Sequence, residues 1–148
     1  MDLAQILEQD MIKALKEKDE VKLSTVRLVR SQIKNVEIDK KAKLSDEDII
    51  GIVQKQIKQR RDVIPDFERV SRQDLIDAAK KEIAVLEGYL PPQLTAEDLK
   101  KIIEKAITEL GATTIKDMGK VMGKIAPEIK GKADGKVASD LVKSLLLG

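Results

Sequence analysis

Apolar residues recur at helical spacing along almost the whole of this 148-residue chain, and no stretch shows the alternation typical of a strand. In residues 2–17, for example, Leu3, Ile6, Leu7 and Met11 fall on one face of a helix. Aromatic residues make up only 1% of the chain, so the core must be packed from aliphatic side chains, which long amphipathic helices do readily. The sequence therefore predicts an all-α protein.

Capping signals divide this pattern into separate helices. Ser45 with Asp48 and Thr95 with Asp98 have the spacing of a capping box, in which each side chain bonds the backbone N–H of the other residue. The remaining expected boundaries are capping boxes at Ser71–Asp74 and Thr114–Asp117 and helix ends at Gly88 and Gly111.

Two consecutive prolines, Pro91 and Pro92, mark the clearest domain boundary in the sequence. They cannot continue a helix, and they hold the backbone extended. We therefore expect an N-terminal helical bundle over residues 1–90 and a small C-terminal helical domain over residues 91–148.

Two other prolines and two glycines fall inside otherwise helical stretches. Pro65 should kink its helix or end it near Phe67, and Pro127 should kink or break its helix because the ring crowds the carbonyl of the residue four positions earlier. Gly119 and Gly123 share one helix face. Because glycine costs about 1 kcal/mol relative to alanine in a helix, this pair suggests that another backbone comes close there.

Several classes of function are excluded or disfavoured by what the chain lacks. It contains no cysteine and no histidine, so it has neither thiol chemistry nor the usual acid–base residue of neutral pH. No nucleophile elbow, Walker A loop or dinucleotide fingerprint occurs, and we expect no catalytic residues, cofactor or metal site. No apolar run approaches a membrane span, and the N-terminus does not resemble a signal peptide, so we expect a cytoplasmic protein that contacts no membrane.

Lysines gather near the C-terminus, although the net charge of the whole chain is only +2. Lys130, Lys132 and Lys136 lie in a short connector between two expected helices, and Asp134 is a natural N-cap for the second of these helices. The first amides and the dipole of a helix attract anions, so the connector suits a phosphate, although the Asp134 carboxylate competes for the same amides. A solvated turn is the alternative explanation.

A second basic row lies on the exposed face of the second expected helix, where Arg27, Arg30 and Lys34 occur at helical spacing. Such a row could contact RNA. A solvated helix face is the commoner explanation of this pattern, and it is the one we expect here.

Four runs of sequence resemble the YqeY-like family of small bacterial proteins. They are VRLVRSQIKNVEID (26–39), QRRDVIPDFERVSRQDL (59–75), EIAVLEGYLPPQL (82–94) and the region after Asp117. Within that region, GKIAPEIKGKADGKVASDLVKSLL is also similar to the C-terminal tail of the B subunit of the tRNA-dependent amidotransferase, which converts Asp-tRNA(Asn) or Glu-tRNA(Gln) to the amide.

The resemblance implies an all-helical fold in two parts and a role in gripping RNA. In the amidotransferase the tail domain helps to hold the tRNA body, and the glutamine-hydrolysing subunit and the kinase-transamidase module have no counterpart in this chain. The resemblance therefore implies a non-catalytic accessory that binds tRNA or other structured RNA. Homology to the amidotransferase would also suggest the name carbon–nitrogen ligase with glutamine as amido donor, but the residues do not support independent catalysis. Positional match gives Lys124, Lys130, Lys132 and Lys136 as contacts, and the helix and turn pattern adds Lys120, Gly131 and Lys143.

Two other functions remain open from the sequence. In a protein–protein adaptor, Gly119, Gly123 and the pair Met118 and Met122 would form a docking surface, although plain core packing is the commoner explanation of such methionines. An accessory subunit of an amidotransferase complex would instead bind the missing catalytic subunits.

Overall fold

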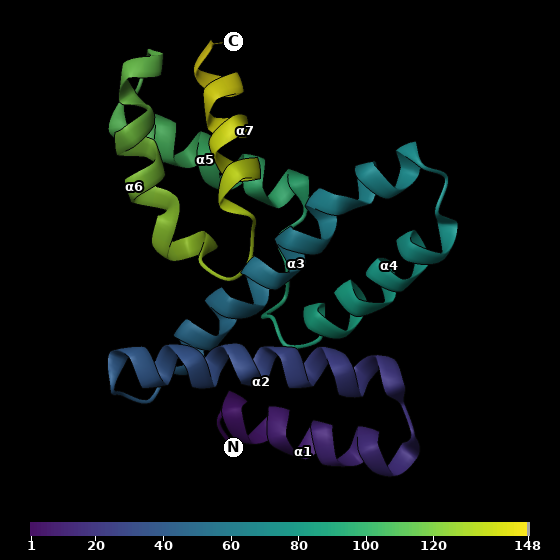
Figure 1. The fold of residues 1–148 in the computed structure, drawn as a ribbon. Coiled ribbons are helices and arrows are strands. Elements are labelled where there is room, and N and C mark those ends of the chain that lie inside the picture. Colours follow the sequence, from purple (N-terminus) through teal and green to yellow (C-terminus); the bar gives the residue numbers. More distant parts are fainter. Residues whose placement is uncertain (148) are drawn as a thin grey trace. The chain divides into compact units, whose positions relative to one another are not determined.

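The computed structural model describes residues 1–147, and every regular element in that range is helical, as predicted (Figure 1). None of the helices in the described residues is both long enough and apolar enough to cross a membrane. The elements are α1 (Leu3–Glu17), α2 (Glu20–Lys40), α3 (Asp46–Arg69), α4 (Gln73–Glu87), α5 (Ala96–Leu110), the short 3₁₀ helix η1 (Ile115–Asp117), α6 (Met118–Ile129) and α7 (Gly135–Leu147).

The chain divides into two compact units between Leu90 and Pro91. We call Met1–Leu90, which contains α1 to α4, the N-terminal unit, and Pro91–Gly148, which contains α5 to α7, the C-terminal unit. Each unit has its own hydrophobic core of buried residues.

The N-terminal unit packs α1 against α2 and α3 against α4, and its core is entirely aliphatic at the most buried positions. Leu7, Val29 and Leu86 are each 0% exposed. At the edge of this core the Tyr89 hydroxyl donates a hydrogen bond of 2.6 Å to Asp10. Burial and the neighbouring Asp10 carboxylate raise the pKa of the Tyr89 phenol, so this group remains a protonated donor at neutral pH.

The C-terminal unit packs α5, α6 and α7 against one another, again around aliphatic side chains. Ile103, Val121 and Val142 are 0% exposed, and Ile125 is 1% exposed. The expectation that this chain builds its cores without aromatic residues is therefore confirmed in both units.

Most of the expected helix boundaries are present. Ser45 and Asp48 form a complete capping box at the start of α3, and Thr95 and Asp98 form another at the start of α5. Gly111 ends α5 in the left-handed conformation, with φ of 64°, which glycine adopts without steric cost.

The capping box expected at Ser71–Asp74 does not form. Helix α4 begins at Gln73 with no side-chain cap, because Ser71 has a left-handed backbone (φ 56°) rather than the extended conformation of an N-cap. The Asp74 carboxylate instead accepts two hydrogen bonds from the Arg72 guanidinium, at 3.0 and 2.8 Å. This pairing lowers the pKa of Asp74 to about 2.

Neither internal proline breaks its helix. α3 continues through Pro65 and beyond Phe67 to Arg69, and α6 continues through Pro127 to Ile129. A proline removes one backbone hydrogen bond, and each of these lies near the C-terminal end of its helix, where few turns depend on that bond.

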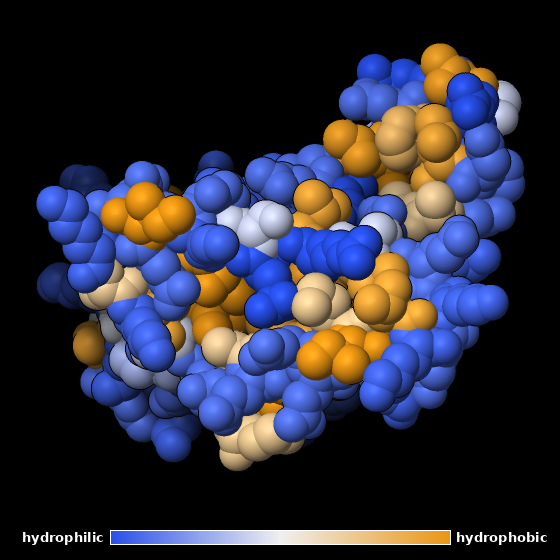
Figure 2. Space-filling model, turned by 60° about the horizontal axis from the view of Figure 1, so that its bottom comes forward, coloured by the Kyte–Doolittle hydropathy of each residue, from blue (hydrophilic) through white to orange (hydrophobic). Residues whose placement is uncertain are grey.

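The surface turned forward in Figure 2 is mostly hydrophilic, with hydrophobic side chains in separate patches. Isolated apolar side chains are normal on a protein surface. The pattern on this face therefore gives no reason to expect a large apolar docking site there.

Candidate nucleic-acid interface

The connector between α6 and α7 is a tight turn over residues 130–134. Gly131 has a φ of 75°, a backbone conformation that residues other than glycine rarely adopt, and it is buried. Gly131 therefore shapes the turn from within, whereas Lys130 and Lys132 on either side of it are exposed.

Backbone hydrogen bonds hold this turn against the segment that enters the C-terminal unit. The Gln93 side-chain amide donates to the Gly131 carbonyl at 2.8 Å, and the Leu94 N–H donates to the Lys132 carbonyl at 2.8 Å. Within the turn, the Lys132 N–H donates to the Ile129 carbonyl at 2.8 Å. The backbone that positions the two lysines is therefore fixed, even though their side chains extend into solvent.

Asp134 caps α7, as expected from the sequence. Its Oδ1 accepts from the Lys136 N–H at 2.7 Å and more weakly from the Val137 N–H at 3.4 Å. These are the amides that a phosphate at the helix start would need. The Asp134 carboxylate therefore occupies the start of α7, and an anion here would have to bind through the exposed lysine side chains.

The exposed face of α6 combines two lysines with two glycines. Lys120 and Lys124 lie one turn apart, beside the exposed Gly119 and Gly123. Nothing in the described residues comes within 4 Å of a Cβ built on either glycine, so the expected close backbone approach does not occur within this chain. Because glycine has no side chain, the helix surface beside the two lysines is free of bulky groups at these positions.

Lys124 is not unpaired on this face. Its ammonium lies 3.0 Å from Oε2 of Glu109 on α5, and this hydrogen bond lowers the pKa of the Glu109 carboxyl. Both side chains are exposed, and ion pairs of this kind are weak. A phosphate can therefore compete with Glu109 for Lys124.

On α7, Lys136 and Lys143 are exposed and two turns apart, so they lie on the same side of the helix. Asp140 lies between them at helical spacing and is also exposed. Its carboxylate reduces the positive potential beside both lysines.

The methionines of the alternative docking surface belong to the core. Met118 and Met122 are partly buried and pack against the buried residues of the C-terminal unit. Of the four residues of that surface, only the two glycines are exposed. The apolar contribution that an adaptor would need from Met118 and Met122 is therefore largely used inside the unit.

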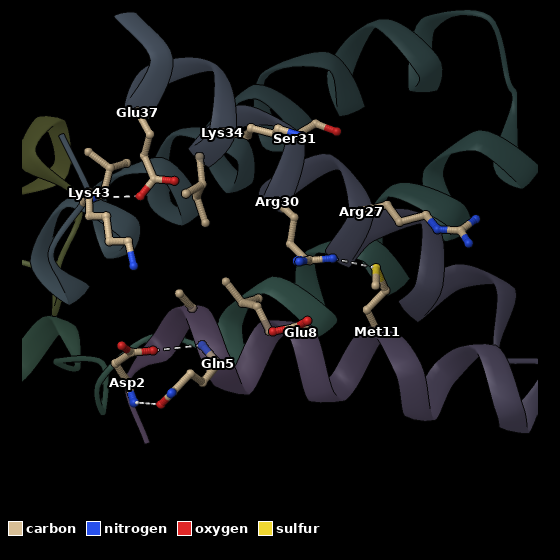
Figure 3. Close-up of a pocket in the computed structure, with 14 residues that line it drawn as sticks. Asp2, Gln5, Glu8, Met11, Arg27, Arg30, Ser31, Lys34, Glu37 and Lys43 are labelled. Carbon is tan, nitrogen blue, oxygen red and sulfur yellow. Dashed lines mark hydrogen bonds between the residues drawn. The ribbon is translucent and has the colours of Figure 1, made fainter. Parts of the chain in front are cut away.

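The basic row on α2 is largely the solvated helix face that we expected, because Arg27 and Lys34 are exposed, whereas Arg30 is half-buried. Arg27, Arg30 and Lys34 line a cavity of about 730 Å³, which α1 closes on its other side (Figure 3). The helical spacing of the row is visible in the sequence, but the facing wall from α1 is not.

Comparison with known proteins places the whole chain in one family. The sequence model of the family described as "Yqey-like protein" matches residues 4–146. The chain belongs to the YqeY-like family. The family resemblance noted in the sequence is thereby confirmed.

Fungal proteins named "Altered inheritance of mitochondria protein 41, mitochondrial" are similar to this YqeY-like chain. The protein of Kluyveromyces lactis is 37% identical over 107 residues, which is 70% of this chain and 58% of that protein. The protein of Lachancea thermotolerans is 30% identical over 155 residues, 99% of this chain and 80% of that protein. That of Vanderwaltozyma polyspora is 34% identical over 119 residues, 76% of this chain and 64% of that protein. The matches thus span less than two thirds of the Kluyveromyces lactis and Vanderwaltozyma polyspora proteins.

Proposed function

We propose that this YqeY-like protein is a non-catalytic accessory that binds structured RNA, with tRNA as the best candidate, through the lysines of its C-terminal unit. The observation that carries the proposal is the connector, where a hydrogen-bonded turn presents Lys130 and Lys132 to solvent. Lys120 on α6 and Lys136 on α7 flank this turn in sequence and are exposed as well. We further propose that it acts in the cytoplasm, whereas the names of the fungal relatives refer to mitochondria.

Recognition in this proposal depends on phosphates and shape. Lysine ammonium groups neutralise phosphates without reading bases. The chain has one tyrosine and one phenylalanine, and both belong to the N-terminal unit, so the C-terminal unit cannot stack unpaired bases on aromatic rings. This composition favours a folded RNA with a regular phosphate backbone over a single-stranded sequence motif.

The proposal predicts strongly salt-dependent binding. If three to five lysines each replace a counterion, the logarithm of the tRNA association constant should fall with the logarithm of salt concentration with a slope of about −3 to −5. Fluorescence anisotropy of labelled tRNA, titrated with the full-length protein at several salt concentrations, measures this slope. Undetectable binding at low salt, or an affinity that hardly changes with salt, would contradict the proposal.

Measuring heparin in the same assay distinguishes recognition of the RNA fold from general attraction to negative charge. Heparin offers a dense negative charge without the fold of tRNA. Tighter binding of tRNA than of heparin at equal salt supports recognition of structured RNA, whereas equal binding reduces the interface to a general polyanion surface.

A further inference from the structure

The cavity between α1 and α2 has features of a binding site that the C-terminal lysines do not share. Its volume of about 730 Å³ lies within the range of roughly 300–1,000 Å³ that is typical of small-molecule sites. Leu7, Ile33 and Leu44 contribute apolar side chains to its lining. The cavity therefore combines an apolar part with the basic row of α2.

Arg30 is the central group of this cavity. In Figure 3 its guanidinium extends from α2 towards α1. Its Nη1 lies 3.0 Å from the Sδ of Met11, and among the described residues this thioether is its only hydrogen-bonding partner. A guanidinium has five N–H donors and a thioether is a weak acceptor, so a half-buried arginine with this partner alone has most of its donors unused.

Three further cations belong to the lining of this cavity, although the Arg27 guanidinium extends away from Arg30 in Figure 3. Arg27 and Lys34 lie one turn before and one turn after Arg30 on α2, and Lys43 approaches from the loop that follows α2. Figure 3 shows Arg27 and Lys43 on opposite sides of Arg30. The described residues form no ion pair with any of these four cations.

Two of the three acidic side chains in the cavity lining accept hydrogen bonds from backbone N–H groups. Asp2 caps α1 by accepting from the Gln5 N–H at 2.9 Å, and Glu37 accepts from the Leu44 N–H at 2.9 Å. Glu8 is the third acid; it is exposed, and Figure 3 shows it on the side of α1 that faces Arg30. The lining therefore holds four cationic and three acidic side chains, an excess of one positive charge.

We propose that this cavity binds a small organic phosphate, namely a phosphate monoester attached to a partly apolar body, as in a mononucleotide. The planar guanidinium of Arg30 donates paired hydrogen bonds to the phosphate oxygens, a geometry that suits phosphate. Arg27, Lys34 and Lys43 add positive charge, and the partly buried Leu44 and Met11 contact the apolar body. This site is independent of the proposed RNA interface, because it lies wholly within the N-terminal unit.

The test is a titration of the ¹⁵N-labelled full-length protein followed by NMR, with the Arg30 Nε–H and the amides of α2 as reporters. Millimolar adenosine 5′-monophosphate is expected to shift these signals, and inorganic phosphate is expected to shift the Arg30 signal alone. Adenosine, which lacks the phosphate, should leave them unchanged. The proposal is overturned if the monophosphate causes no shift, if adenosine shifts the signals equally, or if only tRNA moves them.

Substitutions then identify the groups responsible. Arg30→Met should weaken monophosphate binding by about tenfold or more, because it removes the guanidinium that donates to the phosphate. Lys43→Met, an exposed position whose change should not disturb folding, should weaken it several-fold and keeps the test valid if Arg30→Met fails to fold. Arg69→Met removes one charge from the same unit at an exposed ion pair with Asp66 and should have no effect. Equal losses in all three variants would show a general charge effect and overturn the site.

Discussion

Replacing Ile103 by alanine is expected to lower the free energy of unfolding of the C-terminal unit by about 2–5 kcal/mol. Ile103 is 0% exposed and belongs to the same buried cluster as Val121, Ile125 and Val142. The substitution removes three carbon atoms and leaves a cavity that the surrounding helices can fill only in part. Since each unit has its own core, the N-terminal unit should keep its stability.

The single tyrosine makes this prediction measurable. Tyr89 lies in the N-terminal unit and the chain has no tryptophan, so tyrosine fluorescence reports that unit, whereas circular dichroism reports the helices of both. In Ile103→Ala, part of the dichroism transition should move to lower denaturant while the fluorescence transition stays in place. Leu7→Ala, at a position with 0% exposure in the other core, should move the fluorescence transition instead. If Ile103→Ala shifts both signals together, the two units unfold as one.

The double substitution Lys130→Glu with Lys132→Glu is expected to weaken tRNA binding by on the order of tenfold to a hundredfold at low salt. It replaces two favourable phosphate contacts with two repulsive charges at the centre of the proposed interface. Both side chains are exposed, so helix content measured by circular dichroism should be unchanged.

A matched control exists on α5. Lys100 and Lys101 are exposed, and each lies 3.9 Å from a glutamate one turn away, Glu104 and Glu97 respectively. Lys100→Glu with Lys101→Glu makes the same change in net charge in the same unit and should reduce tRNA affinity far less. Equal losses in both double variants would mean that net charge alone determines binding, and an unaffected Lys130/Lys132 variant would remove the connector from the interface.

Local sequence signals were sufficient to predict most of the fold. The capping boxes at Ser45 and Thr95 and the stop at Gly111 depend on residues within one turn of each other, so the sequence shows them directly. The box expected at Ser71 does not form because Ser71 has a left-handed backbone, and its expected partner Asp74 pairs with Arg72 instead. Helices also tolerated Pro65 and Pro127 where each lies near a helix end.

Features of the candidate sites that depend on long-range contacts could not be predicted. The sequence places Gly131 in a short connector, but its hydrogen bond with the Gln93 side chain joins residues far apart in the chain and could not be predicted. In the same way, Arg30 belongs to a basic helix row in the sequence, and only the packing of α1 brings Met11 to its guanidinium and encloses a cavity. The lysine positions could be predicted, whereas the ion pair of Lys124 with Glu109 could not.

Lysine footprinting tests the central claim, an RNA interface made by the C-terminal lysines, most directly. Exposed ammonium groups of the full-length protein are acetylated with and without saturating tRNA, and the modified peptides are quantified by mass spectrometry. We predict several-fold protection of Lys130, Lys132 and Lys136 and no protection of Lys100 and Lys101. Uniform protection of all lysines, or protection confined to the N-terminal unit, would contradict the claim.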